Sequence, residues 1–490
     1  MDAAIAACAA QGVVEPQSTG IGGDCFCLYA PKGRSDVVGF NGSGKAPSGA
    51  TPTYYQAQGI DVIERPSPHS VVVPGAVDAW CRLQADYGSL PLSDVLAPAV
   101  NLARNGYPLA PRVAREIRVQ QAFLAHDPAI TDLFVPNGEL PTPGQMLYQR
   151  QLADTLEQIG KEGRDAFYSG ANAESMVSHL RGLGGLHTLE DFASVSGDYV
   201  TPITTRYRGH TVYECPPNGQ GVIGLLLLNI MQGAPQHDDP LSLARIHYEI
   251  EACRLAYRVR TQFIADPAFA DVPVETILTT AFADKLRAQI DPQRATVASY
   301  DVTLPRHNDT VCLSVVDKDR NVCSFINTLF WSFGSGILDP GTGVVFTNRA
   351  EGFSLDPASP NCIAPGKRPL HTIIPGMVTT DDRVTLSFGV MGGEYQAMGH
   401  MQFLTRFYDY GFDLQEAQDA PRFMVNPFTH EVELESVLYD RYAEDLRAMG
   451  HTVVPADNPI GGSQAVAIDY DRKSLSGGSD PRKDGCAFGY

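Results

Sequence analysis

Two threonines, Thr310 and Thr328, have the spacing of residues that can carry out nucleophilic chemistry together. The sequence between them alternates like two β-strands joined by the polar turn 317–321. If the strands pair symmetrically about this turn, Thr310 lies opposite Thr328, with the two Cβ atoms about 5 Å apart on one face of the hairpin. A turn of this length also permits a register shifted by one or two residues, which would separate the two hydroxyl groups.

A threonine hydroxyl becomes a useful nucleophile only when a base removes its proton. Cleavage of the peptide bond that precedes Thr310 would supply such a base on the same residue, because a free α-amino group has a pKa of about 7.7–8.0. A sizeable fraction of that amine is neutral at physiological pH, and Thr328 could then donate a hydrogen bond that orients Thr310. The alternative interpretation is structural, since a threonine that begins a strand suits a pleated surface and its hydroxyl caps neighbouring amides.

The hydrophobic pattern predicts helices in the first part of the chain, strands in the second, and helices again towards its end. This order is typical of sheets covered by helical layers, in one interwoven globular unit rather than separate domains on a linker. Helices are predicted at residues 1–11, through most of 75–181, and at 221–230, 241–263, 282–290, 398–408 and 440–449. Strands are predicted at residues 25–30, 36–40, 200–213, 310–316, 322–330, 343–347, 377–380, 384–389, 431–435 and 465–469, with a short strand or turn at 12–16.

The composition is that of a large globular protein with an acidic surface. Of the 490 residues, 43% are hydrophobic, which is enough apolar material for a sizeable core. The formal net charge of −19 disfavours nucleic acid and anionic membranes as partners. The longest apolar run, residues 221–231, is too short to cross a bilayer, and no export signal is visible, so a cytoplasmic location is predicted. The chain opens within a helix, which leaves room for a missing upstream segment with such a signal.

Several apparent cofactor or metal motifs have the wrong residues around them. Residues 39–45 match part of a phosphate-binding loop, but Ala46 stands where a magnesium-binding hydroxyl belongs and Pro47 obstructs the helix that should follow. Gly20-Ile21-Gly22 begins a dinucleotide-binding fingerprint, but Cys25 stands at its third glycine position and no βαβ unit surrounds it. Cys25 and Cys27 are compatible with a metal site or a disulfide, although alternate side chains of one buried strand are the preferred interpretation. The sequence predicts no metal ion and no cofactor.

A set of glycine-rich and proline-rich segments occurs in order along the whole chain. The segments are Val14-Glu15-Pro16-Gln17-Ser18-Thr19-Gly20-Ile21-Gly22-Gly23, Pro74-Gly75, Pro216-Pro217, Thr310 to Asp317, Gly334-Ser335-Gly336, Pro340-Gly341-Thr342-Gly343, Pro365-Gly366-Lys367-Arg368-Pro369-Leu370, Gly389-Val390-Met391-Gly392-Gly393 and Gly478-Ser479-Asp480-Pro481-Arg482. Together they resemble the γ-glutamyltranspeptidase family. Residues 1–309 resemble the large subunit of these enzymes, and residues 310–490 resemble the small subunit, which begins with the nucleophile.

This resemblance implies an α+β fold, the four-layer αββα sandwich of N-terminal-nucleophile hydrolases. It also implies self-cleavage between Asp309 and Thr310, after which the large and small fragments stay associated as a heterodimer. Thr310 would form an acyl-enzyme with a small-molecule amide substrate, supported by Thr328. The backbone amides of Gly392 and Gly393 would form the oxyanion hole, in keeping with the close approach that adjacent glycines allow. Without the resemblance, a plain tight turn is the simpler interpretation of this pair.

The residues expected to bind the acyl group depart from the family pattern. Members that act on γ-glutamyl groups hold the α-carboxylate with an arginine and paired serines, and the α-amine with an amide and acidic residues. The corresponding positions are occupied here by Ser43, by His371 and Thr372, and by Phe330, Arg349 and Gly352, respectively. The acidic partners for an ammonium group are therefore missing from these positions.

An arginine and an aromatic ring in the amine-binding positions favour an acyl group that bears an acid and lacks an α-amine, because arginine binds carboxylates through paired hydrogen bonds. Pairing of Arg349 with Asp356 or another local acid is the alternative. The segment 351–365 is short for a lid, which predicts an open pocket. The sequence therefore predicts an autoprocessing threonine amide hydrolase or acyltransferase. A genuine γ-glutamyltranspeptidase or glutathione hydrolase is one alternative, and an uncleaved, inactive binding or scaffold protein is another.

Overall fold

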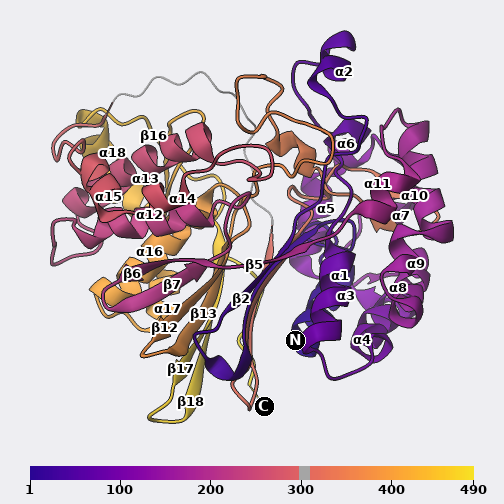
Figure 1. The fold of residues 1–490 in the computed structure, drawn as a ribbon, viewed down its shortest axis with the longest axis horizontal. Helices are drawn as coiled ribbons and strands as arrows, with labels where there is room; N and C mark the ends of the chain where they lie inside the picture. The colour runs from indigo at the N-terminus through magenta and orange to yellow at the C-terminus, as the bar shows by residue number, and fades with distance from the viewer. Residues whose placement is uncertain (297–309, 490) are drawn as a thin grey trace.

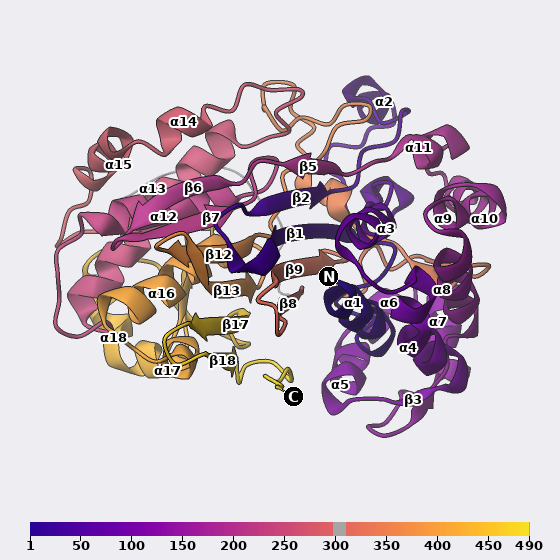
Figure 2. The same cartoon turned by 60° about the horizontal axis from the view of Figure 1, so that its bottom comes forward.

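Two stacked β-sheets lie between two layers of helices in the computed structural model, which describes residues 1–296 and 310–489 (Figure 1, Figure 2). The five-stranded sheet has the order β5 (Asp198–Val200), β2 (Val38–Gly42), β1 (Asp24–Ala30), β9 (Val322–Thr328) and β8 (Val311–Val316). The six-stranded sheet has the order β18 (Ser474–Ser479), β17 (Gly462–Asp469), β13 (Arg383–Met391), β12 (Pro375–Thr380), β7 (His210–Glu214) and β6 (Ile203–Tyr207). The predicted four-layer αββα fold is confirmed.

The two sheets enclose a core of apolar side chains that point towards one another. Phe26 and Ile326 from the five-stranded sheet and Met377 from the six-stranded sheet are buried in this layer. Every residue of β1 and β9 is buried, because helices cover the other face of these strands. A strand buried on both faces can carry apolar residues on both, so apolar and polar residues need not alternate along it.

One helical layer covers the outer face of the five-stranded sheet, on the right in Figure 1. Its main helices pack their apolar faces on one continuous core with residues of β1 and β9. The helices of this layer are α1 (Asp2–Val14), α3 (Ala76–Tyr87), α4 (Leu92–Asn105), α5 (Pro111–Val119), α6 (Gln121–Leu124), α7 (Pro128–Phe134), α8 (Arg150–Glu162), α9 (Asp165–Tyr168), α10 (Gly170–Gly182) and α11 (Leu189–Ser194).

The other helical layer covers the six-stranded sheet, on the left in Figure 1. Its helices are α12 (Gly221–Gln232), α13 (Leu243–Phe263), α14 (Val274–Ile277), α15 (Thr280–Arg287), α16 (Tyr395–Asp409), α17 (Leu414–Asp419) and α18 (Ser436–Ala448). Helix α12 is apolar almost all round because it packs between the sheet, α13 and α16. Among the described residues, no helix combines the length and apolar character needed to cross a bilayer.

Short elements complete the described part of the chain. They are α2 (Pro52–Ala57), β3 (Tyr107–Pro108), β4 (Met146–Leu147), β10 (Leu338–Asp339), β11 (Val344–Val345), β14 (Phe423–Val425), β15 (Val432–Leu434) and β16 (Val453–Pro455), with 3₁₀ turns at Pro31–Gly33, Pro68–Ser70, Pro136–Gly138 and Arg349–Gly352. All ten cysteines are free, and Cys25 and Cys27 are buried neighbours on β1, as the strand interpretation predicted. No group of three or more His, Cys, Asp or Glu side chains in residues 1–296 and 310–489 is arranged to hold a metal ion.

Strands from both sides of residues 297–309 are interleaved in both sheets. β8 and β9 complete a sheet begun by β1 and β2, and β6 and β7 join a sheet made mainly of strands after residue 310. Figure 2 shows this mixing, because the indigo strand β1 lies beside β9, which comes much later in the chain, in one sheet. Neither half of the chain forms either of the two stacked sheets by itself.

Most predicted elements are present, and the differences have local physical reasons. Residues 12–14, predicted as a strand or turn, continue α1 because Val13 is buried in the core under this helix. The strand predicted at 322–330 ends at Thr328, since Phe330 has a positive φ of 82° that a strand cannot contain. The strand predicted at 36–40 is shifted to Val38–Gly42, and the one at 343–347 is reduced to Val344–Val345.

Candidate active site

The hairpin of β8 and β9 brings the two threonines together. Val311 pairs with Asn327 in antiparallel register, so one further step places Thr310 opposite Thr328. The predicted register is thereby confirmed. Both threonines are buried, with 4% and 0% of their surface exposed. Thr328 Oγ1 accepts a hydrogen bond from the Phe330 N–H at 2.9 Å, which leaves the Thr328 hydroxyl hydrogen available for donation.

Asp24, which the sequence analysis missed, extends this row to a third strand. β1 pairs with β9 so that Asp24 lies opposite Thr328 on the side away from Thr310. Directly opposed residues share a face, so the three side chains lie in line across the sheet. Asp24 follows the glycines at 20–23 and begins a strand with no other charged residue. That isolated acid was the available signal in the sequence, because a carboxylate is buried only where partners hold it.

The Asp24 carboxylate holds two residues of the predicted acyl pocket, His371 and Arg349, and the backbone of Gly44 beside a third, Ser43. Its Oδ1 accepts from the Gly44 N–H at 2.7 Å. Its Oδ2 accepts from His371 Nε2 at 3.0 Å and lies 3.4 Å from Arg349 Nε. The Asp24, His371 and Arg349 side chains are fully buried. Asp24 is therefore the centre of a buried polar cluster directly beside the threonine pair.

The Arg349 guanidinium lies between this cluster and an aromatic ring. It is centred 3.7 Å from the Phe330 ring, and its Nη1 donates to Thr372 Oγ1 at 3.2 Å. Burial lowers the pKa of Arg349 to about 10 although Asp24 opposes the shift, so the group stays charged at neutral pH. Its Nη2 has no acceptor among the residues that the structure describes. The ion-pair partner is thus Asp24, far away in the sequence, rather than Asp356, and pairing with a local acid is not observed.

The buried His371 side chain lines the site in its neutral form. Burial and, to a smaller extent, the neighbouring Arg349 lower its pKa to about 4. Its Nδ1 accepts from the Ile373 N–H at 3.3 Å, so Nε2 carries the hydrogen donated to Asp24. Its ring packs edge-on against Phe26 with centroids 4.8 Å apart. Both ring nitrogens of His371 are therefore engaged, so the side chain holds Asp24 in place and has no nitrogen available to act as a base.

Ser43 joins the same cluster through the loop after β2. Its Oγ donates to the Gly44 carbonyl at 3.3 Å and accepts from Asn218 Nδ2 at 3.2 Å. The structure therefore brings the five predicted substrate-binding residues around one carboxylate: Ser43, Phe330, Arg349, His371 and Thr372. All five are buried, so the uncut chain does not show the predicted open pocket. The segment 351–365 is folded onto itself through a bridge between Ser354 and Cys362.

The glycine pair lies at the end of a strand that faces the nucleophile candidate. Ser387 on β13 donates to Ser314 on β8 at 3.2 Å, and a Cβ on Gly389 would lie 2.1 Å from Cys312 Sγ. The strands are antiparallel here: two residues forward along β13, from Ser387 to Gly389, correspond to two residues back along β8, from Ser314 to Cys312. Two residues further, the end of β13 and the glycine pair after it face the start of β8, where Thr310 lies.

Gly392 and Gly393 present two backbone N–H groups with no acceptor among the described residues. Their φ angles of 123° and 55° are ones that side chains disfavour. The Tyr395 N–H donates to the Gly392 carbonyl at 3.0 Å as α16 begins. The pair is thus a tight turn, as the simpler interpretation proposed. It also lies at a helix N-terminus, where the helix dipole favours negative charge.

The loop before β17 supports Gly392 from behind. A Cβ on Gly392 would lie only 2.9 Å from the Gly461 Cα, so the two backbones are in close contact. The backbone carbonyl and the backbone N–H of the neighbouring Ile460 are both hydrogen-bonded. Its carbonyl accepts from Arg422 Nη1 at 2.9 Å, and its N–H donates to Glu435 Oε1 at 3.3 Å.

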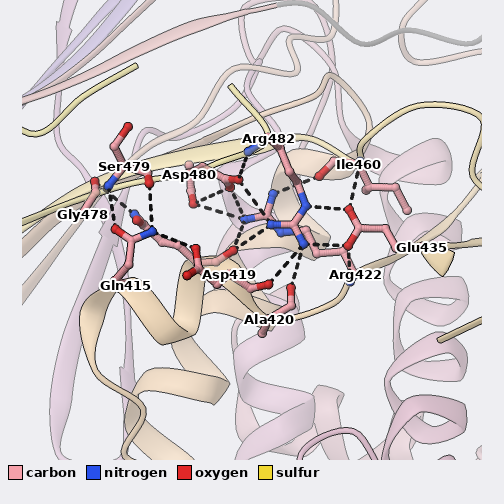
Figure 3. Close-up of polar contacts among 12 residues, drawn as sticks. Gln415, Asp419, Ala420, Arg422, Glu435, Ile460, Gly478, Ser479, Asp480 and Arg482 are labelled. Atoms are coloured by element: carbon pink, nitrogen blue, oxygen red, sulfur yellow. Dashed lines mark hydrogen bonds and ion pairs between the residues drawn. The ribbon is translucent and has the colours of Figure 1, made fainter. Parts of the chain in front are cut away.

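Two arginines and two acids tie this loop to the end of the chain (Figure 3). Arg482 donates to both carboxylate oxygens of Glu435, each at 2.6 Å, and Arg422 pairs with Asp480. Burial raises the pKa of Asp480, but Arg422 and Arg482 lower it more, so the net pKa lies below its usual value. The Gly478–Arg482 segment therefore fixes the backbone on which Gly392 rests.

The sequence is similar along its whole length to known proteins. A family model described as Gamma-glutamyltranspeptidase matches residues 1–490. A Bacillus subtilis protein named Glutathione hydrolase-like YwrD proenzyme is 36% identical, with 100% of this chain and 93% of the relative covered. Oxamate amidohydrolase proenzyme from Klebsiella pneumoniae is 32% identical, with 100% and 94% covered. A crystal structure of cephalosporin acylase from Bacillus halodurans matches with a TM-score of 0.92 at 36% identity, covering 99% of this chain and 90% of that one.

Proposed function

Because the chain belongs to the γ-glutamyltranspeptidase family and is an N-terminal-nucleophile amide hydrolase, we propose that it cuts its own Asp309–Thr310 bond and then uses Thr310 to form an acyl-enzyme. Asp309 lies outside the described residues. The observation that supports this most directly is that Thr310, Thr328 and two backbone amides with no acceptor among the described residues lie at facing strand ends.

Each group has one step in the proposed reaction. The free amine of Thr310 accepts the proton of its own hydroxyl as Oγ1 attacks the substrate carbonyl carbon. Thr328 donates its hydroxyl hydrogen to hold Thr310 in line. The N–H groups of Gly392 and Gly393 bind the oxyanion, a contribution of about 10²–10³ in rate per donor in comparable sites. The amine leaves with the proton as the C–N bond breaks, and water then releases the acid from Thr310.

The arginine site supports an acyl group that carries a carboxylate and lacks an α-amine. Arg349 Nη2 is a buried donor with no acceptor in residues 1–296 and 310–489, so a carboxylate would satisfy it. Asp24, the acid paired with Arg349, is already engaged by Gly44, His371 and Arg349, and an ammonium group bound here would lie beside the like charge of the Arg349 guanidinium. The relative named for oxamate, itself an amide that bears a carboxylate, is in keeping with this choice.

Cleavage is tested on the purified wild-type chain. We expect two fragments on a denaturing gel, with a second N-terminal sequence of Thr-Val-Cys-Leu. The fragments are expected to elute together on size exclusion, because strands of both contribute to both sheets. A fully folded chain that remains in one piece and cleaves no amide would instead support the uncleaved scaffold alternative.

The preference for the acyl group is tested with three p-nitroanilides, which differ in the charged groups at the end of the acyl chain. Glutaryl p-nitroanilide is expected to have at least a tenfold higher kcat/KM than γ-glutamyl p-nitroanilide, a difference of about 1.4 kcal/mol. The reason is that the α-ammonium of the glutamyl group would be buried beside the Arg349 guanidinium, which carries the same charge. Butyryl p-nitroanilide, which lacks the acid, is the matched control and is expected to be slower than the glutaryl compound. A preference for the γ-glutamyl compound would favour a genuine glutathione hydrolase.

A further inference from the structure

The turn formed by Asn218, Gly219 and Gln220, directly before α12, touches several walls of the proposed acyl pocket. Asn218 Nδ2 donates to Ser43 Oγ at 3.2 Å, and the Asn218 carbonyl accepts from the His371 N–H at 2.9 Å. The Gln220 N–H in turn donates to the His371 carbonyl at 2.9 Å. One short turn from the first half of the chain thus fixes His371, in the segment that leads into β12.

The Gln220 side chain links this pocket to the glycine pair. Its Nε2 donates to the Thr372 carbonyl at 2.9 Å and to the Gly393 carbonyl at 3.1 Å. Its Oε1 accepts from Arg260 Nη1 at 3.1 Å. Arginine can only donate, so this contact settles which end of the amide is oxygen. Gln220 is fully buried, and all its hydrogen-bonding atoms are engaged within the described residues.

Arg260 gives the amide a rigid support on α13. It is buried, pairs with the Glu394 carboxylate, and packs 4.7 Å from the Tyr257 ring. The Tyr257 hydroxyl donates to the Glu394 carbonyl. The peptide that joins Gly393 to Glu394 is therefore held at its carbonyl by Gln220 and at the next residue by Arg260 and Tyr257.

We propose that Gln220 is a positioning residue of the reaction, which sets the glycine pair relative to the acyl pocket through its two carbonyl contacts. This inference rests on the proposed function, because it requires Gly392 and Gly393 to bind the oxyanion. Gln220 contacts the backbone of Thr372 and Gly393 and makes no hydrogen bond to Thr310 or Thr328 among the described contacts. Its loss should therefore weaken stabilisation of the transition state more than binding of the substrate.

The test replaces Gln220 by methionine, which has a similar volume and no hydrogen bond to offer. The mature wild-type enzyme and Gln220→Met are compared on whichever of the three anilides the wild type cleaves fastest. We expect kcat to fall by about 10- to 100-fold, as for a misplaced catalytic group, while KM changes less than about threefold. If Gln220→Met does not fold, Gln220→Glu is measured instead, because it keeps the shape and removes the donor.

Gln149 provides the matched control. It is a buried glutamine in the other helical layer, and its Nε2 donates to the Val13 carbonyl at 2.7 Å and to the Tyr107 hydroxyl at 3.1 Å. Gln149→Met loses a similar pair of hydrogen bonds, and neither of its partners belongs to the proposed reaction. Its thermal unfolding midpoint should fall about as much as that of Gln220→Met, while its kcat should stay within about twofold of the wild type.

Three outcomes separate the inference from the function on which it rests. A selective loss of kcat in Gln220→Met, with both variants folded, supports the positioning role. A wild-type kcat in Gln220→Met, or equal losses of kcat in both variants, overturns it while the proposed function stands. A wild-type protein that neither cleaves itself nor turns over an anilide overturns the proposed function, and the positioning role with it.

Discussion

Replacing Thr310 by alanine is expected to leave the chain in one piece and to abolish amide turnover. The hydroxyl that would attack both the Asp309 carbonyl and the substrate is removed, and the amine that would act as base is never released. We expect a loss of at least about 10³-fold in turnover, since the oxyanion amides alone remain. Mass spectrometry of the purified variant and the glutaryl anilide assay measure the two effects separately.

Serine at the same position is the matched control for this experiment. Thr310→Ser keeps the hydroxyl and loses one methyl group, so it should still cut itself and retain measurable turnover. Thr310 is a buried residue with a small side chain at the start of β8. Neither Thr310→Ser nor Thr310→Ala should therefore change the free energy of unfolding by more than about 1 kcal/mol. Cleavage of Thr310→Ala at the same bond would show that another residue is the nucleophile.

Asp24→Asn is expected to lower the free energy of unfolding by about 3–5 kcal/mol, the usual cost of removing one partner from a buried ion pair. The substitution keeps the shape of the side chain and an acceptor for the Gly44 N–H. It leaves the fully buried Arg349 guanidinium without its counter-ion. Urea unfolding followed by fluorescence, with the slope checked for two-state behaviour, measures the change.

Two further variants show whether the charge of Asp24 is responsible. Asp154→Asn removes an acid from an exposed pair with Arg104, and it should change stability by less than about 0.5 kcal/mol. Adding Arg349→Met to Asp24→Asn should recover part of the lost stability, because an apolar side chain needs no counter-ion. If Asp24→Asn unfolds like Asp154→Asn, the buried cluster contributes far less than its geometry indicates.

The nucleophile hairpin could be predicted closely because its signals are local. Two alternating strands around a polar turn fix the register, and the pairing that opposes Thr310 and Thr328 follows from counting outward. The residues at which helices and strands end were less predictable, because these ends depend on packing against distant parts of the chain. Helix α1 runs to Val14, past the glycine at residue 12, because the core beneath it buries Val13.

The surroundings of Arg349 could not be predicted from local pattern. Its partner Asp24 lies 325 residues earlier and meets it only because β1 pairs with β9. The glycine pair at 392–393 was singled out only by resemblance to a family, since adjacent glycines alone indicate no more than a turn. Gln220 was missed for the same kind of reason: a buried glutamine has no pattern in the sequence that distinguishes it from an exposed one.

The interleaving of strands has a consequence for how the molecule can come apart after the proposed cut. The β1–β9 and β12–β7 contacts would join two separate polypeptides along the centre of each sheet. Pulling these chains apart would break both ladders and expose the apolar layer between the sheets. Separation would then be the same event as unfolding, so dilution should not dissociate the mature enzyme under conditions in which it stays folded.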